Sequence, residues 1–222
     1  KSSSGISVSG RCIAVKPNCS VQSYVTPLFA LMQAGYALEA VIVSTLQAVS
    51  GAGFPGPASL QMIDNVIPYI GGEEEKSEQE PLRILGTLSK GQVQPESGLR
   101  ISAHCNRVPV IDGHMACVSL KFAGQKPSSQ EIIQIWQDFS SEPQKLNLPS
   151  APQPPIVYLD EPDRPQPRVD RDAGRGMAVT VGRLRPCKVF DYRFVGLSHN
   201  TVRGAAGGAI LTAELLKAQG YV

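Results

Sequence analysis

The sequence predicts an α+β fold in which a mixed, largely antiparallel sheet carries helices on one face. Alternating or β-branched apolar segments recur along the chain, and segments with apolar residues at helical spacing lie between them. Together they give several antiparallel strands in one broad sheet, with one βαβ unit at the start. The 222 residues are 42% hydrophobic and 18% charged, which supports a packed core in one large domain or two small ones.

The first elements form the predicted βαβ unit. Residues 12–16 are expected to be a short strand, residues 20–33 a helix with Gly35 as its C-cap, and residues 37–47 a buried strand rich in β-branched side chains. Cys19 then lies at the carboxyl end of the first strand, which is where α/β folds place ligands.

The remaining elements follow from local patterns. Helices are expected at residues 60–69, within 71–88 after a turn, at 128–141, and at 201–218 with Asn200 or Thr201 as N-cap. Strand patterns cover residues 100–106, 114–123, 176–185 and 188–198. Seven prolines in residues 148–170 predict a long, mostly irregular segment.

Composition argues against several classes of function. The net charge of +2, without a basic cluster, argues against nucleic-acid binding. No apolar stretch approaches the roughly 18 residues of a membrane span, and the Lys-Ser-Ser-Ser-Gly start has no secretory pattern. Five cysteines without CxxC spacing predict free thiols rather than a disulfide framework or a metal site, which favours the cytoplasm.

One glycine motif resembles a dinucleotide-binding fingerprint. Gly51, Gly53 and Gly56 have GxGxxG spacing after a strand. However, Pro55 and Pro57 lack the backbone N–H groups that such a loop offers to a pyrophosphate. The acidic strand end expected about 20 residues later is replaced by the polar turn GGEEEKS. We interpret the motif as a tight, kinked loop.

Cys19 is the strongest candidate for chemistry. It precedes a predicted helix, whose N-terminal dipole favours a thiolate, although free cysteines are commonly buried packing residues. Arg107 and His114 flank the loop in CNRVPVIDGH and can converge on one point. His104 and His199 are rivals for a histidine role, so these residues alone leave the assignment open.

Five motifs in order carry a resemblance to a known family. They are PNCS, TLQAVSGAGFPG, IPYIGGEEEK, RVPVIDGH and RPQPRVDRDAGRGMAVTVGRLR. Together they closely resemble aspartate-semialdehyde dehydrogenase, in the branch found in fungi and archaea, over residues 12–222. The resemblance implies a fold like the C-terminal domain of glyceraldehyde-3-phosphate dehydrogenase. It also implies NADP-dependent interconversion of aspartyl phosphate and aspartate semialdehyde through a cysteine thioester, with inorganic phosphate as co-substrate, in amino-acid biosynthesis.

The resemblance also implies roles for particular residues. Cys19 matches the nucleophile, His114 the acid/base histidine, and Gln47 the glutamine that orients the substrate. Arg107 matches the arginine that grips the substrate carboxylate. The remaining matches are Glu73 (or Glu74) with Lys76 as a pair meeting the substrate amine and the phosphate, Asn18 in the phosphate or oxyanion region, and Asn200 near the nicotinamide.

The same comparison predicts the domain organisation. Residues 1–11 are expected to be a flexible lead-in, 12–198 a catalytic and dimerisation domain, and 199–222 a C-terminal helix that packs on an N-terminal coenzyme domain. That coenzyme domain is absent from this sequence, so negligible turnover is expected from the chain alone. Strands 114–123 and 176–197 are expected to build the sheet face of a homodimer or higher oligomer, with Phe190, Tyr192 and Phe194 in that contact or in the core.

Other interpretations remain at this stage. A non-enzymatic dimerisation module, or a related reductase of another acyl phosphate or acyl thioester, fits the same composition. A Cys–His hydrolase would need a third orienting group, and no residue at a suitable spacing indicates one. The segment EEEK also reads as a solvated helix start, and Gln47 as a residue that serves only its loop.

Overall fold

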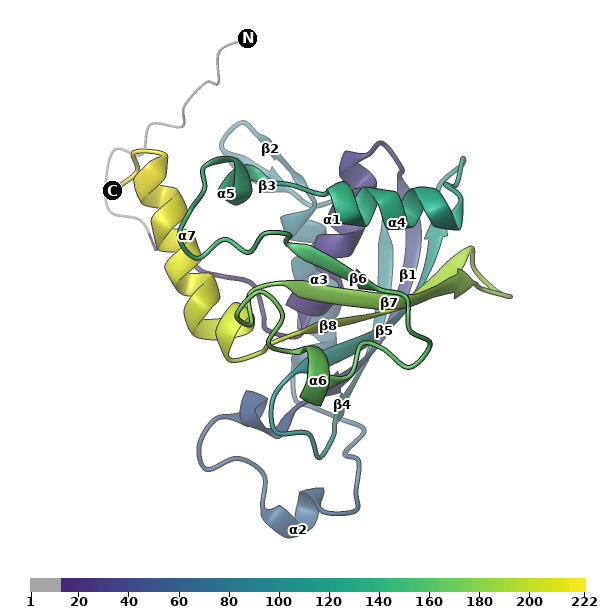
Figure 1. Ribbon diagram of the computed structural model, residues 1–222, viewed down its shortest axis with the longest axis vertical. Coiled ribbons are helices and arrows are strands. Elements are labelled where there is room, and N and C mark those ends of the chain that lie inside the picture. Colours follow the sequence, from purple (N-terminus) through teal and green to yellow (C-terminus); the bar gives the residue numbers. More distant parts are fainter. Residues whose placement is uncertain (1–12) are drawn as a thin grey trace.

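The computed structural model describes residues 13–222, which form one six-stranded sheet, a separate two-stranded hairpin and flanking helices (Figure 1). The strands of the main sheet are β1 (Leu38–Gln47), β4 (Arg100–Arg107), β5 (His114–Phe122), β6 (Ile156–Leu159), β7 (Val179–Pro186) and β8 (Tyr192–Ser198). The hairpin consists of β2 (Thr87–Ser89) and β3 (Gln92–Gln94). The α-helices are α1 (Val25–Gln33), α2 (Ser59–Met62), α3 (Glu73–Ile84), α4 (Ser129–Asp138), α5 (Glu142–Lys145), α6 (Pro167–Asp170) and α7 (Gly207–Ala218).

The main sheet is mixed, with strand order β4-β1-β5-β8-β7-β6. The outer pairs β1–β4 and β6–β7 are parallel, whereas β1–β5, β5–β8 and β7–β8 are antiparallel. Its apolar face packs against α1, α3 and α4, and β5 alternates between buried and more exposed side chains along its length. The predicted class, a largely antiparallel sheet with helices on one face, is therefore confirmed.

Helix α4 closes the core. Its N-cap Ser128 and Glu131 form a capping box, which satisfies two N–H groups of the first turn. Ile132 and Trp136 on its inner side are fully buried. The Trp136 indole N–H donates to the carbonyl oxygen of Pro27 at 3.0 Å, so the only polar atom of this side chain is satisfied.

The βαβ unit predicted at the start of the chain is wrong. Residues 13–17 form no strand, and residue 12 lies outside the described range. Ile13 and Val15 are 92% and 82% exposed, so no sheet buries their side chains, and Pro17 has no N–H to donate. The parallel crossover instead joins β1 to β4 through α3.

Local packing changes several other boundaries. The helix predicted from residue 20 is divided into the 3₁₀ helix η1 (Val21–Ser23) and α1, because the backbone of Tyr24 between them is not helical, with φ −134°. The buried Tyr24 side chain donates its hydroxyl to the carbonyl oxygen of Ser77 at 2.8 Å. The helix at 60–69 shortens to α2, since Ile67 pairs with Arg107 instead. The proline-rich segment contains β6, which pairs with β7.

The C-terminal helix has an irregular start. It opens as a π-helical turn, η3 (Val202–Ala206), before α7, and neither Asn200 nor Thr201 caps it with a side chain. Tyr192 and Phe194 point into the core, which supports the core alternative for these two side chains within one chain. The predicted lead-in at residues 1–11 lies outside the described range. Within residues 13–222, no helix is long and apolar enough to cross a bilayer.

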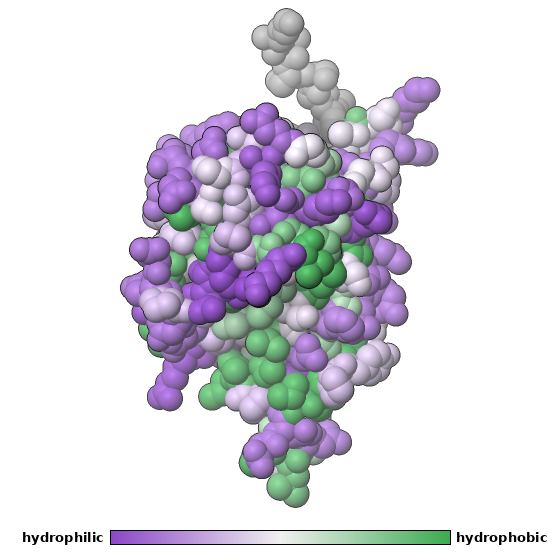
Figure 2. All heavy atoms as spheres, turned by 90° about the vertical axis from the view of Figure 1, so that its right-hand side faces the viewer, coloured by the Kyte–Doolittle hydropathy of each residue, from purple (hydrophilic) through white to green (hydrophobic). Residues whose placement is uncertain are grey.

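The excursion between β1 and α3 projects from one end of the molecule (Figure 1). Figure 2 shows apolar side chains gathered over the lower half of the molecule, toward the end that carries α2 in Figure 1. The exposed apolar residues of the excursion include Phe54, Leu60, Ile63 and Tyr69. A surface of this kind marks a contact site more often than a solvated face.

Candidate active site

The sheet brings three predicted site residues together at one end of its strands. Gln47 and Arg107 end the parallel strands β1 and β4 and are register partners. His114 is the first residue of β5, which runs antiparallel to β1, so His114 lies at the same end of the sheet as Gln47. All three side chains are buried, with Arg107 6% exposed and His114 fully enclosed. Residues separated by 67 positions in sequence thus converge because of strand direction alone.

Ala48 fixes the relation between Arg107 and His114. Its N–H donates to His114 Nδ1 at 3.1 Å, and its carbonyl oxygen accepts from Arg107 Nη1 at 2.7 Å. Because Nδ1 is an acceptor, the neutral ring carries its proton on Nε2. Within the described residues, that buried Nε2 has no hydrogen-bond partner. The site therefore holds an unused donor beside a guanidinium.

Burial controls the charge of this pair. Loss of solvation, reinforced by the Arg107 cation, lowers the pKa of His114 to about 3. His114 is therefore neutral at physiological pH. Burial also lowers the pKa of Arg107, while Glu73 and Cys19 act in the opposite direction. Arginine remains charged under such conditions.

Gly51 provides the space in front of both side chains. A Cβ atom at this position would lie 2.8 Å from His114 Nε2 and 2.9 Å from Arg107 Nη1, well inside van der Waals contact. Gly51 is the first glycine of the GxGxxG motif, so this glycine leaves room at the buried site. Sequence reasoning missed this role because the spacing pointed to a different ligand.

Glu73 joins the other half of the site. Its carboxylate accepts from Asn18 Nδ2 at 2.9 and 3.1 Å and from Gln47 Nε2 at 3.3 Å, and it pairs with Lys76 Nζ at 3.3 Å. Glu74 points elsewhere, accepting the Cys105 N–H at 3.1 Å. Of the two acidic residues that EEEK left open, Glu73 is the one that lies at the site.

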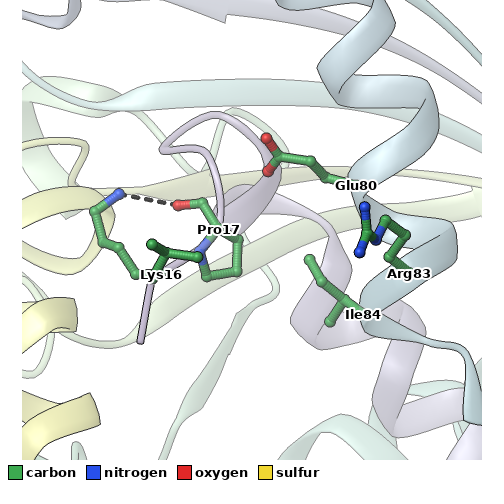
Figure 3. Close-up of a pocket in the computed structure, with 6 residues that line it drawn as sticks. Lys16, Pro17, Glu80, Arg83 and Ile84 are labelled. Carbon is green, nitrogen blue, oxygen red and sulfur yellow. Dashed lines mark hydrogen bonds between the residues drawn. The ribbon is translucent and has the colours of Figure 1, made fainter. Parts of the chain in front are cut away.

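Hydrogen bonds of the Asn18 side chain and of its backbone N–H fix the loop that carries Cys19. Asn18 Oδ1 accepts from the N–H and the hydroxyl of Ser20, both at 2.8 Å. The Asn18 N–H donates to Glu80 Oε2 at 2.7 Å. Figure 3 shows Glu80 reaching from α3 toward the Lys16–Pro17 segment, across a cavity of about 360 Å³. Glu80 lies seven residues after Glu73, on the same side of α3, and this spacing is the signal that sequence reasoning overlooked.

The resting state of the Cys19 thiol differs from the sequence expectation. Burial and the Glu73 charge raise the pKa of Cys19, and they outweigh Lys16 and the backbone N–H groups of Cys19 and Ser20. The described residues ahead of the loop, 13–18, form no strand, and only the three-residue η1 follows the loop directly. The predicted helix-dipole activation is therefore absent, and the isolated site holds a protonated thiol.

The C-terminal segment packs directly on Cys19. A Cβ at Gly204, within η3, would lie 2.6 Å from Cys19 Cβ and 3.0 Å from its Cα. A Cβ at Gly207 would lie 2.5 Å from Met177 Sδ. These two small residues thus serve contacts within this chain. Single-turn π segments occur frequently at functional sites, and here one brings a glycine against the candidate nucleophile.

Asn200 lies near the site but its amide is used internally. Its Oδ1 accepts the Gly113 N–H at 2.7 Å, and its Nδ2 donates to Ser50 Oγ at 2.8 Å. It bridges the loops that carry His114 and Gly51. Within the described residues, neither rival histidine hydrogen-bonds to this arrangement: His104 is exposed, and His199, which contributes to the lowered pKa of His114, contacts Thr201 and Asp172.

Neither a metal site nor a complete nucleotide site is formed by the described part of the chain. No group of three His, Cys, Asp or Glu side chains among residues 13–222 is arranged to hold a metal ion. For a dinucleotide such as NADP, both polar atoms of the Asn200 amide already make a hydrogen bond within the chain, and Pro55 and Pro57 interrupt the donors of the glycine loop. Residues 13–222 supply a thiol, a buried cation and a carboxylate network, and they do not form a dinucleotide pocket.

The fold and the site define a class of domain. Residues 28–203 match the family described as "Semialdehyde dehydrogenase, dimerisation domain", and the chain belongs to this family.

The individual relatives indicate one enzyme within this family. The chain is 51% identical over 212 residues to the aspartate-semialdehyde dehydrogenase of Aspergillus fumigatus, covering 92% of this chain and 58% of that protein. It is 48% identical over 206 residues to the enzyme of the same name from Methanothermobacter thermautotrophicus, again covering 92% and 58%. The chain therefore spans a little over half the length of these relatives.

A solved structure gives the same result. The aspartate-semialdehyde dehydrogenase of Candida albicans, described as solved with NADP, is 44% identical, with a TM-score of 0.84 over 93% of this chain and 57% of that one. The predicted resemblance to the fungal and archaeal branch is thereby confirmed. The roles carried over for individual residues stay predictions.

Proposed function

We propose that this chain carries the acyl-transfer site of an aspartate-semialdehyde dehydrogenase, which interconverts aspartyl phosphate and aspartate semialdehyde through a thioester on Cys19. The observation that carries the proposal is the convergence of the Cys19 loop, the Glu73 carboxylate network and the Arg107–Ala48–His114 cluster at one end of the sheet. The 51% identity to a relative of that name supports the choice of substrate.

Arg107 and Glu73 bind the two charged ends of the aspartyl group. Arg107 uses one Nη1 bond on Ala48 and keeps further donors of its guanidinium for the substrate carboxylate. Glu73 is the carboxylate that meets the substrate ammonium, and Lys76, half-exposed beside it, meets the phosphate together with Asn18. Gln47 orients the intermediate from its bond to Glu73.

Substrate binding also changes the charge state of the reacting groups. The Glu73 charge contributes to the raised pKa of Cys19, so an ammonium group against Glu73 lowers that pKa toward the thiolate. The Arg107 cation contributes to the lowered pKa of His114, so a carboxylate on Arg107 raises it. The substrate itself thereby favours an ionised nucleophile and a protonated histidine.

Groups of this chain then supply the acyl-transfer step. Cys19 Sγ forms a bond to the acyl carbon of aspartyl phosphate, and the bond from that carbon to the phosphate oxygen breaks. Phosphate leaves with the electron pair, and the thiol proton passes to solvent or to the leaving phosphate. The N–H at His114 Nε2 donates to the carbonyl oxygen as negative charge develops on it.

Hydride exchange and assembly belong to the whole protein. We propose NADP as the hydride carrier because the Candida albicans relative is described as solved with NADP. We propose a homodimer or higher oligomer because the family is described as a dimerisation domain, and the exposed apolar residues of the α2 excursion offer contact area.

The acyl-transfer half-reaction tests the proposal because it needs no hydride carrier. The 222-residue chain is mixed with aspartyl phosphate, quenched in acid, digested and analysed by mass spectrometry for an aspartyl thioester. We expect the label on Cys19, its absence in Cys19→Ala, and strong reduction in Arg107→Met. Acetyl phosphate serves as the matched acyl donor because it lacks the ammonium and carboxylate groups of the aspartyl group. Equal labelling of Cys19 and the exposed Cys117 would favour a non-enzymatic dimerisation module, and equal rates with both donors would favour a reductase of another acyl phosphate.

A further inference from the structure

A second cavity is lined by none of the residues assigned to the acyl-transfer site, and α1, α5 and α7 around it lie in the half of the molecule opposite α2 (Figure 1). It has a volume of about 250 Å³ and is enclosed by α1, the segment from α4 through α5, the start of β6 and α7. Its apolar wall includes Phe29, Phe139, Pro143 and Leu211. Phe29 and Phe139 meet edge to face with ring centroids 6.0 Å apart, which gives that wall a defined shape.

Arg203 is the charged group of this cavity. It lies in η3, and its guanidinium donates from Nη1 to the carbonyl oxygen of Met177 at 2.6 Å and from Nη2 to Thr26 Oγ1 at 3.0 Å. These bonds use two of the five donors of a guanidinium. Its Nε is shielded from solvent and has no partner within the described residues.

Within the described residues, no carboxylate pairs with this cation, because none of the salt bridges among residues 13–222 includes Arg203. Burial lowers the pKa of Arg203 to about 10, and no charged neighbour contributes, so the group stays protonated at neutral pH. A partly buried cation without a counter-charge is costly, which favours an anion brought by a ligand.

The other polar groups of the cavity are already paired. Ser141 Oγ donates to Gln144 Oε1 at 2.7 Å, and Gln144 Nε2 donates to the carbonyl oxygen of Pro152 at 3.0 Å. The cavity thus offers one free cationic donor set and an apolar wall. This combination matches a ligand with a single carboxylate on an apolar body, whereas a phosphate would leave most of its oxygens against proline and phenyl groups.

We propose that this cavity is a binding site for a small apolar monocarboxylate, whose carboxylate pairs with Arg203 and whose apolar body packs against Phe29, Phe139 and Leu211. The cavity shares no lining residue with the acyl-transfer site, although Arg203 directly precedes Gly204, which packs on Cys19. The proposal does not depend on the proposed function. Its volume lies just below the usual range for drug-sized ligands, so the ligand is small.

The test compares a carboxylate with its neutral amide on the 222-residue chain. Amide shifts of ¹⁵N-labelled protein are followed by NMR during titration with 3-phenylpropanoate or 3-phenylpropanamide. We expect saturable shifts around residues 139–155 and 203–211, with the amide about tenfold weaker or more because it lacks the charge-assisted bond. Equal affinities, or no saturation by the carboxylate, would overturn the proposal.

A pair of variants locates the binding. Leu211→Trp fills the cavity without removing Arg203, whereas Ile210→Trp makes the same change at the neighbouring residue, which is 54% exposed and does not line the cavity. We expect 3-phenylpropanoate binding to be lost in the first and kept in the second. Unchanged binding in Leu211→Trp would show that the carboxylate binds elsewhere and would also overturn the proposal. If Leu211→Trp does not fold, the comparison of carboxylate and amide on the unmodified chain decides.

Discussion

Gly204→Ala should displace the Cys19 loop. The added Cβ would lie 2.6 Å from Cys19 Cβ, 3.0 Å from its Cα and 3.4 Å from its carbonyl oxygen. Carbon atoms in contact normally lie about 3.5–4.0 Å apart, so the loop or η3 must shift by roughly 1 Å. Overpacking of this kind costs about 1–3 kcal/mol, of which better helix propensity returns up to about 1 kcal/mol. The net loss of stability should therefore be modest.

The effect on chemistry should be much larger than the effect on stability. A misplacement of about 1 Å at a reacting group costs on the order of 100-fold in rate. The assay measures the rate of Cys19 acylation by aspartyl phosphate, with urea unfolding of the same sample. Gly71→Ala is the matched control, because a Cβ there meets only the Tyr69 hydroxyl at 3.8 Å. An acylation rate for Gly204→Ala within twofold of the unmodified chain would refute the argument.

Two further predictions concern ionisation. Glu73→Gln removes a charge that raises the pKa of Cys19, so the midpoint of the pH profile for Cys19 alkylation by iodoacetamide should move to lower pH. Glu74→Gln is the control and should leave the midpoint in place, because the partner of Glu74 is the Cys105 N–H. Equal shifts in both variants would contradict the assignment. His114 has a folded-state pKa of about 3 against about 6.5 unfolded, so the unfolded state binds more protons between these values and stability falls as pH falls. From pH 7 to pH 5 the unmodified chain should lose about 2 kcal/mol more than His114→Gln in urea unfolding, and parallel losses would show that His114 is not buried in its neutral form.

The elements that sequence predicted well share a strong local signal. The strands at residues 37–47, 100–106 and 114–123 match β1, β4 and β5 closely, because each alternates or is apolar throughout. Residues 13–16, the described part of the predicted first strand, have a similar apolar composition but pair with no neighbouring strand, so a local pattern alone cannot form a ladder there. Prolines on either side of the short strand β6 obscured its strand pattern. Its partner β7 begins 20 residues after the end of β6, so no local turn signal indicated the pairing.

The candidate site was predicted in part, and the difference has a physical reason. Cys19, Arg107 and His114 stood out as candidates because of their residue types and positions, but their roles, and that of Glu73, rested on the resemblance of the motifs around them. Glu73 was separable from Glu74 only by the direction in which each points from α3. The raised pKa of Cys19 was missed because it depends on burial and on Glu73, neither of which spacing reveals.

The residues that sequence could not reveal act through backbone atoms or through the absence of a side chain. Ala48 links Arg107 to His114 with its own N–H and carbonyl oxygen, so any residue type except proline that fits the space can perform this role, and no motif marks it. Gly51 and Gly204 matter because a Cβ at either would strike His114 or Cys19. Gly51 also shows that a glycine in a motif rejected for one ligand can still matter to the site: its spacing suggested a phosphate loop, whereas in the fold its lack of a Cβ leaves room for the buried His114 and Arg107 side chains.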